Sequence, residues 1–302
     1  MKSIVVCLCL LAGNALQAGA QEKTREEIDR EKRMQEEASK VNKDTTRFEG
    51  WKNTAQTGVN LTQVSFKDWV AGGENAVSYT AWVQGASALF SEHTVWKNSY
   101  KLAFGQAKLG DQGIRKTDDE ITLETLLIYT MGTYINPYAA ATLRTQCAPG
   151  YVYDGTASRR VSQFFDPAYM IQSAGFAYQP GPGFTTRLGG AVREVLTSAF
   201  PAYADDPSTP GIETTRITGG VESVTDVAAS LDDNVTLTAR LELFAPFKTM
   251  DRIIVRNDYA ITAKVSKYIA TNFTVNILND VNVSSRTQIK QALSLGFTYS
   301  LL

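Results

Sequence analysis

The sequence has very few of the residues on which nucleophilic and metal-dependent chemistry usually relies. It contains a single histidine, His93, and three cysteines, of which Cys7 and Cys9 lie within the first ten residues. The rest of the chain therefore has Cys147 alone, so neither an intramolecular disulfide nor a cysteine-rich metal site can form there. A hydrolase that depends on a histidine base would have to use His93, which we expect at a short turn.

The chain also lacks a long apolar run beyond its first twelve residues and an excess of charge of one sign. Charged residues make up 20% of it, the net charge is −1, the isoelectric point is about 6.0 and the mean hydropathy is −0.18. This excludes a bundle of membrane-spanning helices, each of which needs about twenty apolar residues, and gives no indication of nucleic-acid binding. A membrane β-barrel is not excluded, because its lipid-facing and lumen-facing residues alternate and average out.

The N-terminal fifty residues divide into two segments of different character. Lys2, an apolar run over 4–12 and Ala18-Gly19-Ala20 form the pattern of a secretory signal, so we expect residues 1–20 to be removed. Residues 21–50 are dense in both signs of charge and have no apolar face to bury. We expect a periplasmic segment there, helical or disordered, and a plug that enters the barrel is the alternative.

The last sixteen residues, 287–302, carry the clearest pattern in the chain. Apolar and small or polar residues alternate with a period of two, broken in the apolar row only by Gln291: Ile289, Leu293, Leu295, Phe297, Tyr299 and Leu301 against Lys290, Ala292, Ser294, Gly296, Thr298 and Ser300. A long strand with one apolar face at the C-terminus is typical of an outer-membrane barrel that closes on its first strand.

Similar patterns predict about twelve strands from Trp51 to the C-terminus. We place them at 57–66, 76–90, 94–107, 119–130, 134–147, 163–178, 184–198, 213–229, 235–245, 252–265, 268–278 and 287–301. Short and mostly longer connections alternate between them, which predicts an all-β, antiparallel, up-and-down transmembrane barrel over 51–302, with the loops 148–162 and 199–212 outside the cell. A soluble β-sandwich is the alternative.

Several local motifs resemble those of a known family. They are Trp69-x-x-Gly72-Gly73-Glu74-Asn75, Trp96-x-Asn98, Lys116-Thr117-Asp118-Asp119, Arg144-Thr145-Gln146 with Ala148-Pro149-Gly150-Tyr151, and Phe164-Phe165-Asp166-Pro167-Ala168-Tyr169. From Trp51 onward the chain resembles an uncharacterised Bacteroidota-type outer-membrane barrel family, known as a domain of unknown function. The resemblance implies a barrel and no assigned chemistry.

The residues of the glycine-containing motif are also candidates for an outer loop. Paired glycines allow a close backbone approach, so we expect Trp69, Gly72, Gly73, Glu74 and Asn75 to fold over the barrel mouth. The alternative is a tight turn at the membrane interface.

The polar faces of the expected strands supply candidates for a solute path. Fifteen charged residues are expected to face inward, nine basic and six acidic: Lys97, Lys101, Glu120, Glu124, Arg144, Arg187, Arg193, Glu222, Asp226, Arg240, Glu242, Arg256, Asp258, Lys264 and Lys290. We expect many to pair across neighbouring strands. They form either a structural ion-pair network or a slightly basic path, in which Arg144, with Gln146 on the same face, is the first candidate for contact with a solute.

These observations favour a passive channel or transporter for small polar solutes in the outer membrane, surrounded by lipid. The alternatives are a barrel that serves as an envelope or surface-binding scaffold and, less favoured, a membrane-embedded hydrolase. We expect no enzyme activity, no cofactor and no metal site. The acidic clusters Asp118-Asp119-Glu120 and Asp205-Asp206 lack calcium-loop spacing, and we expect them to be solvated loop charges.

Overall fold

The computed structural model describes residues 49–65, 74–154, 157–206, 209–282, 284 and 286–301. The expected signal and most of the charged segment, within 1–48, lie outside the described residues, as do Trp69, Gly72 and Gly73. In the part that is described, no helix is long and apolar enough to cross a membrane. The helix η1, Pro201–Tyr203, is a short 3-10 turn.

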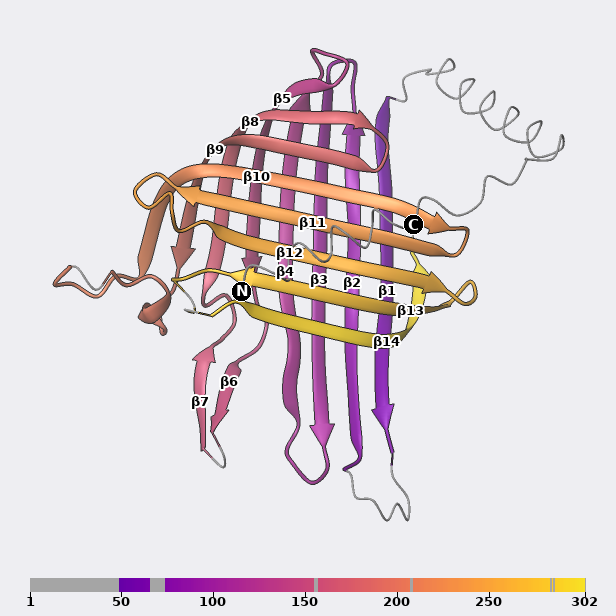
Figure 1. Cartoon of the computed structure of the whole chain (residues 1–302), viewed down its shortest axis with the longest axis vertical. Coiled ribbons are helices and arrows are strands. Elements are labelled where there is room, and N and C mark those ends of the chain that lie inside the picture. The colour runs from indigo at the N-terminus through magenta and orange to yellow at the C-terminus, as the bar shows by residue number, and fades with distance from the viewer. Residues whose placement is uncertain are drawn as a thin grey trace, which may run out of the picture. The chain divides into compact units, whose positions relative to one another are not determined.

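The described chain consists almost entirely of antiparallel strands and their connections (Figure 1). The strands are β1 (Gly50–Val64), β2 (Ala76–Phe90), β3 (Thr94–Leu109), β4 (Arg115–Tyr129), β5 (Ile135–Thr145), β6 (Gly150–Asp154), β7 (Ala157–Ser162), β8 (Ala168–Gly181), β9 (Phe184–Leu196), β10 (Thr215–Asp232), β11 (Val235–Pro246), β12 (Ile254–Lys264), β13 (Ile269–Asn279) and β14 (Gln288–Ser300).

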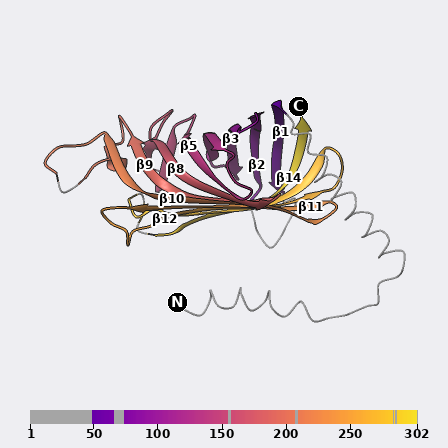
Figure 2. The same cartoon turned by 90° about the horizontal axis from the view of Figure 1, so that it is seen from above.

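Twelve of these strands form one closed barrel, and β6 and β7 form a separate hairpin. The barrel closes where β14 pairs with β1, with Phe297 opposite Val59, so the closure expected from the C-terminal pattern is confirmed. Strands β10 to β14 cross in front of β1 to β4 in Figure 1, and seen from above β10, β11 and β12 lie in a flattened wall (Figure 2). One closed sheet rules out the β-sandwich alternative, which needs two open sheets.

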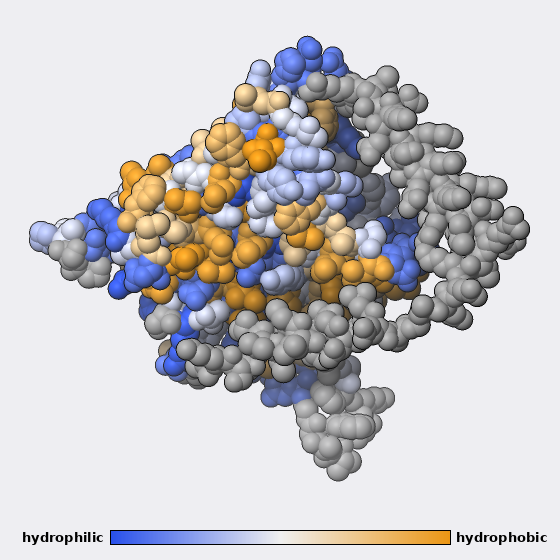
Figure 3. Space-filling view, turned by 45° about the horizontal axis from the view of Figure 1, so that its top comes forward, coloured by the Kyte–Doolittle hydropathy of each residue, from blue (hydrophilic) through white to orange (hydrophobic). Residues whose placement is uncertain are grey.

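Side chains alternate between the interior and the outer surface of the barrel. In β2, Val77, Tyr79 and Val83 are exposed on the outside, while Ser78 and Thr80 between them are half-buried. Many large apolar residues of other strands are exposed in the same way, and an apolar band crosses the face shown in Figure 3. A closed barrel with an apolar outer surface can leave that surface in lipid, where every backbone group is already satisfied by a neighbouring strand.

The connections at the two ends of the barrel differ in length, as the sequence predicted. One end, the short-turn end, carries the turns at 91–93, 130–134, 182–183, 233–234 and 265–268. The other, the long-loop end, carries the connections at 65–75, 110–114, 146–167, 197–214, 247–253 and 280–287. Aromatic residues meet near the short-turn end, where Trp51 and Trp96 lie 6.0 Å apart and Tyr268 stacks on Tyr299 at 6.5 Å between ring centroids. Such residues commonly mark a membrane interface.

Several expected elements differ from the structure, and three of the differences change what lies at a strand end or in a loop. The first strand begins at Gly50 and not at 57, because the polar stretch after Trp51 pairs with β2 along its full length. The expected loop 148–162 contains the β6–β7 hairpin. The strand expected from 163 begins at Ala168. Phe165 has a φ of 57°, which lies outside the strand region, so Phe164 and Phe165 belong to the loop.

One row of the wall places a tyrosine over two glycines. Tyr138 of β5, Gly175 of β8, Gly189 of β9 and Glu222 of β10 lie opposite one another in successive strand pairs. A Cβ at Gly189 would lie 2.8 Å from the Tyr138 hydroxyl and 2.2 Å from the Ala174 carbonyl oxygen. Glycine is therefore required there, and the buried Tyr138 ring fills the space that it leaves.

Candidate functional site

Five charged side chains meet inside the barrel from opposite walls. Glu124 of β4 binds Arg187 of β9 and, at 3.0 Å, Arg240 of β11. Arg240 also binds Glu242 at 2.6 Å, and Glu242 binds Arg144 of β5. We call these five residues the interior ion cluster. Strand β4 is not hydrogen-bonded to β9 or β11, so the ion pairs span the lumen.

The interior ion cluster is shielded from water to an unusual degree for charged groups. The side chains of Arg187 and Glu124 are 4% and 11% exposed. Each of the five side chains has an ion-pair partner, but Nε of Arg187 is buried without a hydrogen-bond partner. Isolated buried charges are costly, so the cluster holds together only while its members remain paired.

A second group of interior charges is wetter. Lys101 binds Glu120 at 2.7 Å across the neighbouring strands β3 and β4, and Arg256 of β12 binds Asp258 at 3.3 Å and approaches Glu120 at 3.9 Å. Lys101 is 46% exposed. Asp226, which binds Arg240 at 3.1 Å, is 43% exposed. Water therefore reaches charged side chains partway along the strands.

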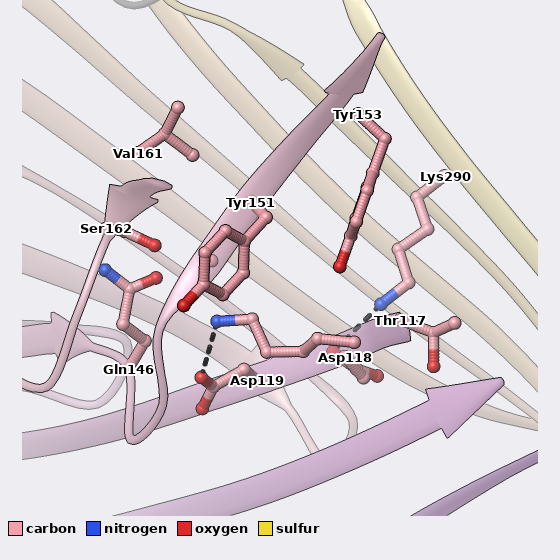
Figure 4. Close-up of a pocket in the computed structure, with 11 residues that line it drawn as sticks. Thr117, Asp118, Asp119, Gln146, Tyr151, Tyr153, Val161, Ser162 and Lys290 are labelled. Atoms are coloured by element: carbon pink, nitrogen blue, oxygen red, sulfur yellow. Dashed lines mark hydrogen bonds and ion pairs between the residues drawn. The ribbon is translucent and has the colours of Figure 1, made fainter. Parts of the chain in front are cut away.

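A cavity of about 330 Å³ opens at the long-loop end, between β4, the β6–β7 hairpin and β14 (Figure 4). We call it the outer cup. Its lining consists of Lys116, Thr117, Asp118, Asp119, Gln146, Gly150, Tyr151, Tyr153, Val161, Ser162 and Lys290.

The two lysines of the outer cup are each bound to a carboxylate. Lys116 donates to Asp119 at 2.8 Å and to the Ala148 carbonyl oxygen at 2.7 Å. Lys290 of β14 binds Asp118 of β4 at 2.9 Å, and this pair spans the mouth of the barrel. The two lysines and two aspartates leave the outer cup with no net formal charge.

The hairpin that forms one side of the cup is anchored to β4 and to the loops around it. Asp119 accepts backbone N–H groups of Cys147 and Ala148, at 2.7 and 2.8 Å, so the chain turns just after β5 ends. Gly150 starts the hairpin where a Cβ would lie only 2.3 Å from the Ser162 hydroxyl. The motif Ala148-Pro149-Gly150 therefore supplies a turn that brings Tyr151 and Tyr153 over the cup.

A buried carboxylate joins two of the long loops. Asp166 accepts hydrogen bonds from the Thr197 and Ser198 hydroxyls and from the Ala199 backbone N–H, the last at 2.8 Å. Burial alone would raise the pKa of this carboxyl, but the hydrogen bonds outweigh it and hold the pKa below its ordinary value. The charged form of Asp166 therefore links the 146–167 connection to the 197–214 connection.

The structure brings many of the expected lumen residues together, but not in the expected way. The members of the interior ion cluster pair mainly across the lumen, whereas pairing across neighbouring strands was expected. The physical reason is that arginine and glutamate side chains are long enough to reach one another from strands that are not neighbours. Pairs of the expected kind are Lys101 with Glu120 and Arg240 with Asp226.

The remaining candidates lie in different places. Lys97 is exposed near the short-turn end of β3. Gln146 does not continue the row of Arg144; its amide donates to the Asp166 carbonyl oxygen at 2.9 Å and it lines the outer cup. At the long-loop end, Gly110 donates its N–H to the Asn75 carbonyl at 2.7 Å, and the Glu74 carboxylate lies beside Gly110.

The interpretation of one acidic cluster was wrong. Asp118, Asp119 and Glu120 lie within β4 and are not solvated loop charges, because each is bound by a lysine, and the Asp119 side chain is almost fully buried. Four further residues of the outer cup were not expected at a site: Lys116, Tyr151, Tyr153 and Ser162. The signals that could have found the first two were the Lys116-Thr117-Asp118-Asp119 and Ala148-Pro149-Gly150-Tyr151 motifs.

His93 lies in the turn between β2 and β3, as expected. Its imidazole is exposed at the short-turn end, 3.6 Å from the Glu92 carboxylate and with its ring centroid 6.2 Å from that of Tyr129. This places it at the opposite end of the barrel from the outer cup.

Comparison with known proteins finds one family. Residues 61–151, from the second half of β1 to the start of the β6–β7 hairpin, match the family described as "Protein of unknown function (DUF3078)". The match includes the motif Trp69-x-x-Gly72-Gly73-Glu74-Asn75. It also includes the two motifs of the outer cup, Lys116-Thr117-Asp118-Asp119 and Ala148-Pro149-Gly150-Tyr151. No match was found among curated proteins.

Several solved outer-membrane barrels are similar to this chain at low identity. The translocator domain of the autotransporter NalP from Neisseria meningitidis is 14% identical, with 91% of this chain and 97% of that chain covered and a TM-score of 0.38. An outer-membrane channel from Pseudomonas putida F1 is 12% identical, with 85% and 98% covered and a TM-score of 0.37. The Ralstonia pickettii toluene transporter TbuX is 9% identical, with 84% and 89% covered and a TM-score of 0.30. At these TM-scores the assignment as an outer-membrane type of barrel rests on the closed sheet and its apolar outer surface.

Proposed function

We propose that this protein is a passive path for small polar solutes across the outer membrane. The outer cup is its entrance, and the interior ion cluster is its constriction. The long loops face outward and residues 21–50 lie in the periplasm. The sequence motifs further support a Bacteroidota-type origin of the family.

The observation that carries this proposal is the water exposure of interior charges away from the mouth. Lys101 and Asp226 lie partway along β3 and β10 and are about half exposed, so the interior is wet on that part of the wall. A lumen filled by its own side chains would bury such groups. Because acidic and basic residues are mixed, the path suits small polar solutes better than ions of one sign.

A non-transporting scaffold is the second candidate, and the interior ion cluster favours it. Pairs such as Arg144 with Glu242 tie opposite walls together and would stabilise a closed barrel. We infer no catalytic role for the protein. The single histidine of the sequence, His93, lies at the short-turn end, away from the outer cup, which supports this inference against a hydrolase with a histidine base there.

Planar-bilayer conductance of the purified protein, with and without Arg144→Ala, tests the proposal. We expect measurable conductance of the wild type and a higher conductance of the variant, because one of the ion pairs that narrows the lumen is lost. If neither protein conducts and Arg144→Ala changes only the melting temperature, the scaffold is the surviving account.

A further inference from the structure

We propose that the outer cup binds a neutral, polyhydroxylated solute of the size of a mono- or disaccharide. Such a solute would be the substrate class of the proposed transport function, and only its uptake through the barrel rests on that function. Binding at the outer cup can be measured whether or not the barrel conducts.

The charge balance of the outer cup argues against a ligand of one sign. A phosphate or a carboxylate would have to displace Asp119 from Lys116 or Asp118 from Lys290, and each of those aspartates is held in place by the fold of β4. A cation would have to compete with the same lysines for the aspartates. A neutral ligand leaves both ion pairs intact. Its hydroxyl groups can donate hydrogen bonds to the aspartate carboxylates and accept them from the lysine ammonium groups.

Two aromatic rings adjoin this polar floor. Tyr151 and Tyr153 are 46% and 39% exposed, their ring centroids lie 6.3 Å apart, and both rings line the cavity (Figure 4). The Arg115 guanidinium lies 4.2 Å from the centroid of the Tyr153 ring and holds it from one side. A tyrosine offers an apolar face and a polar tip, which suits a ligand with C–H faces and hydroxyl edges such as a sugar ring.

The remaining lining groups and the size of the outer cup agree with this ligand class. Gln146, Thr117 and Ser162 present neutral amide and hydroxyl groups, which can each donate and accept hydrogen bonds. Gly150 lets the Ser162 hydroxyl approach this side of the outer cup, because a Cβ there would collide with it. The cavity volume of about 330 Å³ lies at the lower end of the usual range for small-molecule sites.

The test is NMR on the full chain in detergent, with saturation transfer for sucrose and glycine and 31P line broadening for inorganic phosphate, which has no carbon-bound protons. We expect binding of sucrose and none of the other two. Tyr151→Ala and Tyr153→Ala should each weaken sucrose binding by about tenfold, the usual scale for loss of an aromatic contact. Tyr153→Phe should retain it, since the apolar face is kept. Tyr134→Ala is the matched control, because Tyr134 is also an exposed tyrosine but lies at the short-turn end.

A charge variant tests the neutrality of the outer cup directly. Asp118→Asn leaves Lys290 without its carboxylate, so the variant should gain phosphate binding that the wild type lacks. Preferred binding of phosphate or glycine by the wild type, or sucrose binding that survives both tyrosine-to-alanine variants, would overturn the proposal.

Liposome swelling separates this inference from the proposed function. Sucrose binding without swelling in any solute would refute the transport function and leave the outer cup as a binding site. Swelling in small solutes, together with an absence of sucrose binding, would refute the saccharide site and leave the transport function standing.

Discussion

Removing the charge of Glu124 should destabilise the barrel strongly, although the substitution by glutamine keeps the size of the side chain. Glu124 is the acidic partner of both Arg187 and Arg240 and is one-tenth exposed. In Glu124→Gln, Arg187 would be a buried guanidinium that has lost its carboxylate and whose Nε already lacks a partner. Breaking a buried ion pair from one side typically costs about 3–5 kcal/mol, so we expect a loss of that order in the free energy of unfolding.

Lys101→Gln is the matched control for this prediction. It also breaks a close interior ion pair, at 2.7 Å, but Lys101 is nearly half exposed, and the Glu120 carboxylate that is left behind is 22% exposed and keeps Arg256 at 3.9 Å. Exposed pairs contribute about 0–1 kcal/mol, so this variant should unfold almost as the wild type does. The measurement is urea unfolding of the folded barrel in lipid vesicles, followed by the shift of the folded band on a gel. Equal midpoints for the two variants would refute the conclusion that burial makes the interior ion cluster the stabilising group.

Three further predictions concern single positions outside this cluster. Gly189→Ala should destabilise the barrel by about 1–3 kcal/mol in the same unfolding assay, because its Cβ would meet the Ala174 carbonyl and the Tyr138 hydroxyl. The adjacent Gly190→Ala should be neutral, since nothing lies within 4 Å of a Cβ at that position. Because the pKa of Asp166 is depressed, its stabilisation of the two long loops is complete above the ordinary value of 3.8 and is lost as the pH falls below it. Limited proteolysis of these loops should therefore be faster at pH 3, and in Asp166→Asn the loops should be cleaved rapidly already at pH 7. Unchanged cleavage would contradict the role of the charge. In a Cys147→Ala background on intact cells, a membrane-impermeant thiol reagent should label Asp154→Cys in the β6–β7 hairpin and not Asp233→Cys in a short turn, and the reverse result would invert the proposed orientation.

The strands were predictable because a barrel strand repeats a local pattern. In β11 the alternation over Val235–Pro246 is set by neighbours in the sequence and needs no knowledge of the rest of the fold. The same rule failed at Phe164 and Phe165, where apolar residues imitate a strand but the chain turns before Pro167. It also failed at the start of β1, where polar residues after Trp51 hide a strand that pairing with β2 stabilises.

The partners of the interior charges could not be predicted in the same way. The strand pattern shows that Arg240 and Glu124 face inward, but they are 116 residues apart and belong to strands that do not pair. Whether they meet depends on the width of the closed barrel between these strands, which is a property of all twelve strands together.

Arg144 and Gln146 show where face assignment from sequence ends. A period of two puts them on one face, and it would place both in the lumen if the strand continued. Strand β5 ends at Thr145, however, and the next peptide groups turn to donate to Asp119 of β4. Arg144 therefore joins Glu242 in the interior ion cluster, while Gln146 lies in the outer cup. A single strand end thus divides the expected solute site into a constriction and an entrance, and each can be altered by mutation without touching the other.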